Sequence, residues 1–322
     1  MANKDNFNHS KPFICRLIFF FCVCIMLILP ACSDTKTPIN NKVKASEKSN
    51  RQSSLLIGLI PEQNIFEQMD RYKPVANYIS DKIGVTINLK VLTRYGNIVD
   101  NFIELGLDGA FFGSFTYTIA HAKLGVEPLA RPVDLRGSST YYGLIFVRKD
   151  SGINDSLDMK GKTFAFVDQA TTAGYLFPLA YFKRNGIKDY KTYFKETYFT
   201  GTHEDAIYDV LNRKADIGAA KNTVFYKHLD NDPRVSNELI VLSESITVPE
   251  NGLAVRKDLP GPLKDKLKNV LLGMNGDPDG ARILKEFMSQ RFIETTDLEY
   301  EGVYKYLNDI ELDIATYNYI ND

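Results

Sequence analysis

The sequence predicts an α/β protein of two lobes, each with a mixed, mostly parallel sheet flanked by helices, joined by two crossover strands. Three observations support this. The chain has 322 residues, and single cores stop growing beyond about 250 to 300 residues. Strand-like and helix-like segments alternate from Leu55 to the C-terminus, as in parallel sheets with crossover helices. A weak internal repeat also recurs at an offset of 108 residues.

The order of elements begins with an apolar run at 55–60, which is typical of a strand covered on both faces. We expect the next helix to hold Pro74 in its first turn and to end at Gly84. Two extended stretches, 140–147 and 245–255, are the candidate crossovers. Lobe 1 is therefore predicted to comprise residues 54–140 and 248–322, and lobe 2 residues 141–247.

The internal repeat places a polar aromatic side chain at the corresponding position of each copy. Tyr95 stands before a helix and a strand that begins at Asp108, and His203 stands before a helix and a strand that begins at Asp216. Both intervals are thirteen residues long. Two similarly built lobes facing one cleft would give this pattern. Chance is the alternative, because βαβ units are alike in length.

The N-terminus has the features of a lipoprotein signal. All four cysteines lie within the first 32 residues, after a basic leader and thirteen nearly all apolar residues at 17–29. A bilayer span takes about 20 apolar residues. The run Leu29-Pro30-Ala31-Cys32 resembles a bacterial lipobox, which implies that residues 1–31 are a signal peptide and that Cys32 carries lipid. An ordinary export signal with a chance cysteine is the alternative.

The composition predicts a polar segment after the signal and argues against nucleic-acid binding. Residues 32–53 are too polar to order themselves and are predicted to be a flexible tether, or else an arm packed on the body. The chain holds 39 Lys plus Arg against 40 Asp plus Glu, and residues 1–31 take three basic and one acidic residue, leaving a net charge near −3. No basic face for nucleic acid is visible.

No cofactor or metal site is predicted either. Gly161-Lys162-Thr163 ends like a phosphate-binding P-loop, but Ser156 replaces the first glycine of that motif. The spacing from Asn275 to Glu286 matches a calcium loop, but we interpret it as a solvated turn before a helix.

A run of small hydroxyl residues indicates an anion site. Thr171-Thr172-Ala173-Gly174 follows the strand-like segment 163–167 and opens a helix. Helix starts leave free N–H groups with partial positive charge, and adjacent hydroxyls complete a cradle for an oxyanion. The alternative is plain capping by one threonine.

A series of short motifs runs along the chain from about Leu56 to Leu307. The motifs are Ile57-Gly58-Leu59-Ile60-Pro61, Tyr95, Asp108-Gly109-Ala110-Phe111-Phe112-Gly113, Thr140-Tyr141, Met159-Lys160-Gly161-Lys162-Thr163-Phe164-Ala165-Phe166, Thr171-Thr172-Ala173-Gly174 and Gly201-Thr202-His203. Their order resembles that of the periplasmic phosphate, phosphite and phosphonate binding proteins of ABC importers. The resemblance implies a type II periplasmic binding protein fold, a small oxyanion ligand, no catalysis, and a permease and an ATPase as partners.

The same resemblance assigns roles to five residues. Thr171 and Thr172, with nearby backbone N–H groups, would hold the oxyanion, and His203 would donate to it. Tyr95 and Tyr141 would close the cleft from the lobe 1 side.

Two departures from the family pattern bear on the ligand. Ala173 stands where members usually carry a third hydroxyl, and Ser114 at another helix start either replaces that donor or merely caps. Lys221 stands where a carboxylate for a ligand ammonium is expected, which favours an amine-free or more anionic ligand. Lys221 on a solvated face is the alternative. Glu250 is the carboxylate retained as an ammonium partner.

The sequence therefore predicts an exported, periplasm-facing lipoprotein that binds a phosphonate-, phosphite- or phosphate-like oxyanion for an ABC importer. The same fold serving as the sensory partner of a membrane kinase is the alternative. A hydrolase of phosphorylated substrates is the third reading, and the lack of a paired nucleophile and base argues against it.

Overall fold

The computed structural model describes residues 54–62, 64–96 and 98–319, all of which belong to one compact unit of the chain. The predicted signal peptide, the tether at 32–53 and Cys32 lie outside the described residues. In the part of the chain that is described, no helix has the length and apolar character needed to cross a bilayer.

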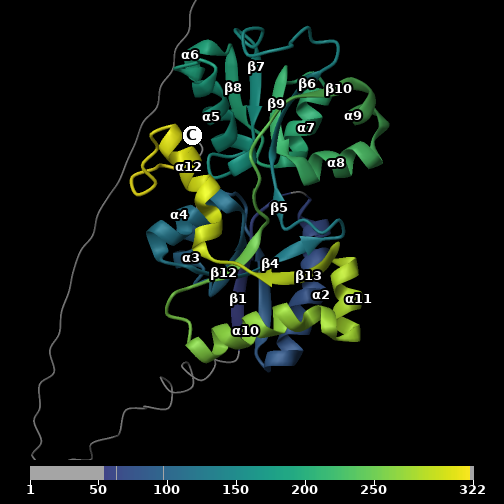
Figure 1. The fold of residues 1–322 in the computed structure, drawn as a ribbon, viewed down its shortest axis with the longest axis vertical. Coiled ribbons are helices and arrows are strands. Elements are labelled where there is room, and N and C mark those ends of the chain that lie inside the picture. The colour runs from purple at the N-terminus through teal and green to yellow at the C-terminus, as the bar shows by residue number, and fades with distance from the viewer. Residues whose placement is uncertain (1–53, 63, 97, 320–322) are drawn as a thin grey trace, which may run out of the picture. The chain divides into compact units, whose positions relative to one another are not determined.

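The first sheet has six strands in the order β13-β4-β12-β3-β1-β2 (Figure 1). Strand β1 pairs in parallel with β2 and β3, and the remaining pairs are antiparallel. We call this sheet and its helices lobe 1. Its strands are β1 (Ser54–Leu59), β2 (Thr86–Val91), β3 (Gly109–Phe112), β4 (Glu127–Asp134), β12 (Gly252–Val255) and β13 (Ser289–Glu294).

The second sheet has five strands in the order β10-β6-β9-β7-β8 and forms the centre of lobe 2 (Figure 1). Strand β7 is parallel to β8 and β9, whereas β6 is antiparallel to β9 and β10. The parallel triplets β2-β1-β3 and β8-β7-β9 thus have the same order, and the internal repeat falls on β3 and β9. The strands are β6 (Gly143–Arg148), β7 (Thr163–Phe166), β8 (Glu196–Phe199), β9 (Ile217–Lys221) and β10 (Leu239–Glu244).

The two-lobed α/β fold is as predicted, but neither sheet is mostly parallel. The first sheet has two parallel and three antiparallel strand pairs, and the second has two of each. The reason is the path of the chain. The strand that enters each lobe from a crossover, β12 in lobe 1 and β6 in lobe 2, runs against the parallel triplet of its sheet and is antiparallel to both of its neighbours. Two short strands, β5 (Thr140–Tyr141) and β11 (Val248–Pro249), form an antiparallel pair between β4 and β6 on one passage and β10 and β12 on the other. Both lie inside the stretches predicted as crossovers.

Helices cover both faces of each sheet. In lobe 1, one face carries α2 (Ile65–Ile83), α10 (Gly261–Gly273) and α11 (Pro278–Glu286), and the other carries α3 (Ile98–Glu104) and α4 (Ser114–Leu124). In lobe 2, one face carries α7 (His203–Leu211), α8 (Asn222–Asn231) and α9 (Pro233–Glu238). The other carries η1 (Thr172–Leu176), α5 (Phe177–Arg184) and α6 (Tyr190–Tyr193). The chain also forms η2 (Met274–Gly276), η3 (Asp297–Tyr300) and α12 (Glu301–Asp309).

The start of helix α2 differs from the prediction. The helix begins at Ile65, so Pro74 lies in its middle rather than in its first turn. Asn64 makes the early start possible, because its side chain accepts hydrogen bonds from the N–H groups of Phe66 and Glu67. The predicted end is confirmed, since Gly84 adopts a left-handed conformation with φ of 71° and caps the helix.

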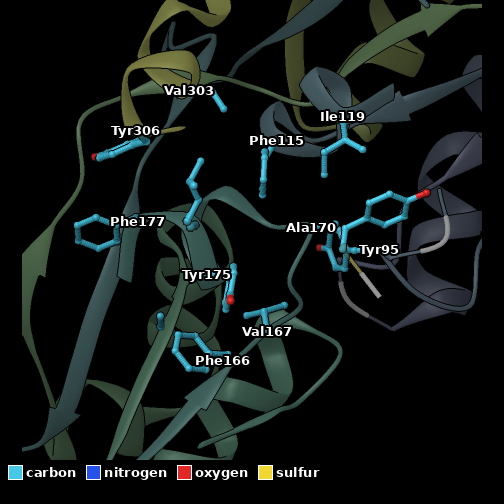
Figure 2. Close-up of a cluster of buried hydrophobic side chains, with 14 of the residues drawn as sticks. Tyr95, Phe115, Ile119, Phe166, Val167, Ala170, Tyr175, Phe177, Val303 and Tyr306 are labelled. Carbon is cyan, nitrogen blue, oxygen red and sulfur yellow. The ribbon is translucent and has the colours of Figure 1, made fainter. Parts of the chain in front are cut away.

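One apolar cluster continues from lobe 1 into lobe 2 (Figure 2). It includes Phe115 and Ile119 of α4, Tyr175 of η1, Phe177 of α5 and Val303 of α12. Each lobe has a separate cluster on the opposite face of its sheet. Apolar packing therefore joins the two lobes along one side of the crossovers.

The C-terminal segment 310–319 ties the lobes together as well. The Tyr317 hydroxyl donates to the carbonyl of Gln169 in lobe 2 at 2.9 Å, and Glu311 pairs with Lys183 of α5 at 2.9 Å. Lys123 of α4, in lobe 1, donates to the carbonyl of Ala315 at 2.9 Å. The segment thus contacts both lobes.

Candidate functional site

A small cavity lies where the parallel strands of both sheets end. Ligand sites in α/β proteins form outside the carboxyl ends of such strands. The cavity measures about 10 Å³, which is room for about one water molecule. Its walls come from lobe 1, lobe 2 and the crossovers: Ile60, Glu62, Tyr95, Gly113, Phe115, Thr116, Tyr141, Ala170, Thr171, Thr172, His203, Lys221 and Asn251.

Six of the seven predicted ligand residues line this cavity. They are separated by up to 126 positions in the sequence, and the carboxyl ends of the strands bring them together. The seventh, Ser114, lies outside the lining. Its hydroxyl donates to the carbonyl of Pro249 in β11 at 2.6 Å, which ties the start of α4 to a crossover.

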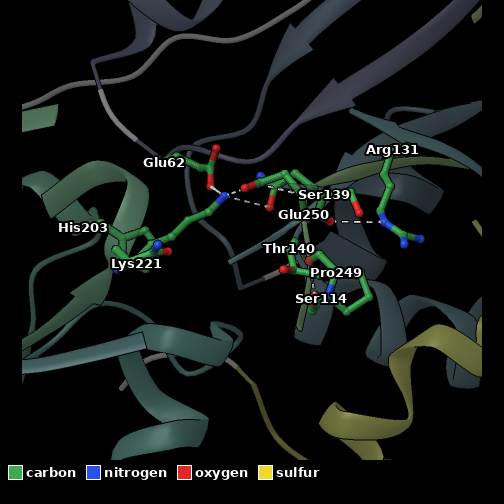
Figure 3. Close-up of polar contacts among 12 residues, drawn as sticks. Glu62, Ser114, Arg131, Ser139, Thr140, His203, Lys221, Pro249 and Glu250 are labelled. Atoms are coloured by element: carbon green, nitrogen blue, oxygen red, sulfur yellow. Dashed lines mark hydrogen bonds and ion pairs between the residues drawn. The ribbon is translucent and has the colours of Figure 1, made fainter. Parts of the chain in front are cut away.

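Lys221 at the end of β9 reaches across the cavity from lobe 2 (Figure 3). Its ammonium donates to Glu62 at 2.8 Å and to Glu250. Asn251 Oδ1 lies 3.4 Å from the same nitrogen, and the ring centre of Tyr141 lies 4.4 Å away. The solvated position considered from the sequence is wrong, because only 3% of Lys221 is exposed.

The charge of Lys221 depends on its partners. Burial disfavours the ammonium form, but the negative charges of Glu250 and Glu62 outweigh burial and raise the pKa of Lys221. Lys221 therefore stays charged at neutral pH. A buried lone cation would be costly, so the two carboxylates are the reason that this lysine can lie here.

His203 is held as a neutral donor. It opens α7 in the lobe 2 wall, and its Nδ1 accepts a hydrogen bond from the Lys221 N–H at 3.2 Å. Burial and the positive charge of Lys221 lower the pKa of His203 to about 3. The neutral ring consequently carries its proton on Nε2.

The two threonines play different parts. Thr171 donates its hydroxyl to the carbonyl of Asp168 at 2.6 Å, within its own turn. Thr172 accepts a hydrogen bond from the backbone N–H of Phe115 at 3.0 Å, which links η1 of lobe 2 to α4 of lobe 1. Simple capping is not observed, because Thr171 makes no side-chain cap hydrogen bond.

Glycine is required behind the threonines. A Cβ on Gly174 would lie 2.4 Å from the Cβ of Val167, which follows β7. The Val167 N–H also donates to the carbonyl of Gly174 at 3.2 Å. The missing side chain thus lets the Thr171-Thr172 turn pack closely on the end of β7.

Tyr95 supplies an unused hydroxyl. Only 2% of the residue is exposed, and its hydroxyl oxygen has no hydrogen-bond partner among the described residues. Burial raises the pKa of Tyr95, so the hydroxyl keeps its proton. Buried polar atoms are almost always paired, so an unpaired one beside a cavity points to a ligand.

The sequence reasoning missed Glu62 and Asn251. Glu62 follows the carboxyl end of β1, as Tyr95 follows β2, so the same strand-end rule indicates it. Asn251 directly follows Glu250, and its N–H donates to the Glu250 carboxylate at 2.9 Å.

Two lobes joined by two short strands, with polar groups of both lobes on one cavity, define a two-lobed solute-binding protein. The chain belongs to the family described as ABC transporter, phosphonate, periplasmic substrate-binding protein, whose model matches residues 57–300. This confirms the family and the type II fold predicted from the sequence. Members of this family are substrate-binding components rather than enzymes.

Individual relatives agree with this family. The chain is 24% identical over 266 residues to the phosphonates-binding periplasmic protein of Escherichia coli, covering 81% of this chain and 78% of that protein. It is 25% identical over 301 residues to the phosphate-import protein PhnD of Mycolicibacterium smegmatis, covering 87% and 91%.

Solved structures support the same fold. A binding protein component of an ABC phosphonate transporter from Pseudomonas aeruginosa matches with a TM-score of 0.74 at 22% identity, covering 81% of this chain and 87% of that one. PhnD1 of Prochlorococcus marinus, in complex with methylphosphonate, matches with a TM-score of 0.72 at 21% identity, covering 81% and 100%.

Proposed function

We propose that this chain binds a small tetrahedral oxyanion of the phosphonate, phosphite or phosphate kind in the interlobe cavity and delivers it to an ABC permease and its ATPase. Lipid on Cys32 would hold the protein at the membrane, facing the periplasm. The chain would form and break no bond in its ligand. The relatives named above, described as binding phosphonates or importing phosphate, support this ligand class.

The observation that carries the proposal is the set of donors around one cavity. Neutral donors suit an oxyanion because each hydrogen bond to a charged oxygen is stronger than a neutral one. The Nε2–H of His203 comes from lobe 2, and the unpaired hydroxyl of Tyr95 comes from lobe 1. The hydroxyls of Thr171 and Thr172 lie on the same walls and would turn toward an oxyanion.

Such a ligand needs the lobes to separate. A cavity of about 10 Å³ holds no tetrahedral anion, so binding has to begin from a wider cleft. The crossover pair β5 and β11 is the natural hinge, since both connections between the two sheets pass through it. An anion that accepts hydrogen bonds from both lobes then favours the closed form, as in hinge closure of periplasmic binding proteins.

Calorimetry on the purified full-length protein tests the ligand class. We expect heat of binding and a raised melting temperature with at least one of phosphate, phosphite and methylphosphonate. Sulfate and acetate serve as controls for anion binding in general. If none of the three phosphorus oxyanions binds, or if sulfate binds equally well, the proposed ligand class is wrong.

A further inference from the structure

The groups that surround the Lys221 ammonium form a complete cation site. Two carboxylates, Glu62 and Glu250, accept its hydrogen bonds, and Asn251 Oδ1 lies at 3.4 Å. The face of Tyr141 lies 4.4 Å from the same nitrogen, as in cation–π recognition of an ammonium. These four residues lie after β1, in β5 and between β11 and β12.

The cation that fills this site comes from the opposite wall. Lys221 belongs to β9 of lobe 2, whereas the groups around its ammonium belong to lobe 1 and the crossovers. The site would therefore exist without the lysine. Its two carboxylates, whose side chains are only 12% and 18% exposed, would then lack a cation, which is costly.

The cation site and the proposed oxyanion site are continuous. Glu62, Tyr141, Asn251 and Lys221 line the same cavity as Thr171, Thr172 and His203. A ligand with an ammonium a few bonds away from an oxyanion could reach both sets of groups, provided that Lys221 did not occupy the first set.

We propose that Lys221 acts as a built-in ammonium that fills a primary-amine subsite and so restricts the protein to amine-free oxyanions. The inference rests on the proposed function and narrows its substrate class. A tethered group competes at an effective concentration of about millimolar or more. A ligand amine would also have to displace the Lys221 ammonium from both carboxylates, leaving a buried charge unpaired.

Removal of the lysine should reverse this preference. Lys221→Ala deletes the three carbons and the ammonium beyond Cβ, and an aminoethyl group can fill that space. The ammonium of 2-aminoethylphosphonate would then pair with Glu62 and Glu250. We expect this variant to bind 2-aminoethylphosphonate about tenfold or more tightly than the wild type does, because buried charge pairs of this kind are strong.

The decisive comparison uses two phosphonates of nearly the same shape. Propylphosphonate replaces the amine of 2-aminoethylphosphonate with a methyl group. By calorimetry on full-length protein, the wild type should bind propylphosphonate more tightly and Lys221→Ala should bind 2-aminoethylphosphonate more tightly. Lys227→Ala is the matched control, because it removes another lysine that pairs across the lobes, with Glu67 at 2.8 Å, but outside the cavity. It should keep the wild-type order.

The wild-type measurement alone keeps the inference falsifiable if Lys221→Ala does not fold. Tighter binding of 2-aminoethylphosphonate than of propylphosphonate by the wild type would overturn the inference and leave the proposed function standing. Failure of every phosphorus oxyanion to bind the wild type would instead refute the proposed function.

A second readout does not depend on phosphonates. Methylammonium chloride should raise the melting temperature of Lys221→Ala more than the same concentration of sodium chloride does, because a free cation can refill the site. Lys227→Ala should show no such difference. Equal effects of both salts on Lys221→Ala would contradict the cation subsite.

Discussion

The lowered pKa of the buried His203 leads to a prediction about how stability depends on pH. Replacement by Asn keeps an acceptor for the Lys221 N–H, because the Asn Oδ1 can take the position of the imidazole Nδ1. The replacement removes only the titrating ring. The difference between the two proteins in their response to pH therefore reports the buried imidazole.

The size of the effect follows from the pKa of His203. Burial and the Lys221 charge lower it to about 3 in the folded protein, against 6.5 ordinarily. Below pH 6.5 His203 therefore binds a proton in the unfolded chain but not in the folded chain, so the unfolding free energy falls as the pH drops. At pH 5 the loss is 1.5 pH units at 1.36 kcal/mol each, or about 2 kcal/mol.

Urea denaturation at pH 7.5 and pH 5 measures this loss. Between the two pH values, the wild type should lose about 2 kcal/mol more unfolding free energy than His203→Asn does. The other titrating groups are common to both proteins and cancel in the comparison. Equal losses would show that His203 is not held neutral by its surroundings, and a His203 ring resonance that titrates near pH 6.5 in NMR spectra would say the same.

Three further predictions follow from the site and its anchor. Tyr95→Phe should leave the unfolding free energy within about 0.5 kcal/mol and weaken oxyanion binding about threefold to tenfold, since its hydroxyl has no partner among the described residues; unchanged affinity by calorimetry would remove Tyr95 from the site. Gly174→Ala should destabilise by about 1 to 3 kcal/mol in urea, because its Cβ would meet Val167 at 2.4 Å. Gly273→Ala, with open space around the new Cβ, is its control and should not destabilise. Cys32→Ser should release the protein from the membrane fraction and abolish labelling by a fatty-acid analogue, and retained labelling would exclude Cys32 as the lipid attachment site.

The sequence was informative about local order and much less so about distant partners. The alternation of strands and helices predicted the fold class. The family resemblance, together with the threonine run after a strand, predicted most of the residues that line the cavity. The helix start predicted from Pro74 is wrong, because an N-cap at Asn64 outweighs the usual preference of proline for a first turn. Lys221 was recognised as unusual, but its environment depends on Glu62, which lies 159 positions earlier. No local pattern predicts such a pair.

The contacts of the C-terminal segment 310–319 with both lobes have a consequence for the proposed separation of the lobes. Two crossover strands alone would allow a simple hinge rotation of one lobe relative to the other. The contacts of Tyr317 and Glu311 with lobe 2 and of Ala315 with lobe 1 would form a third connection, and separation of the lobes would have to stretch or break some of them. Truncation of the chain before Tyr317 would remove contacts that favour the closed form. The unliganded protein would then be more open, and the ligand would have to contribute more of the free energy of closure.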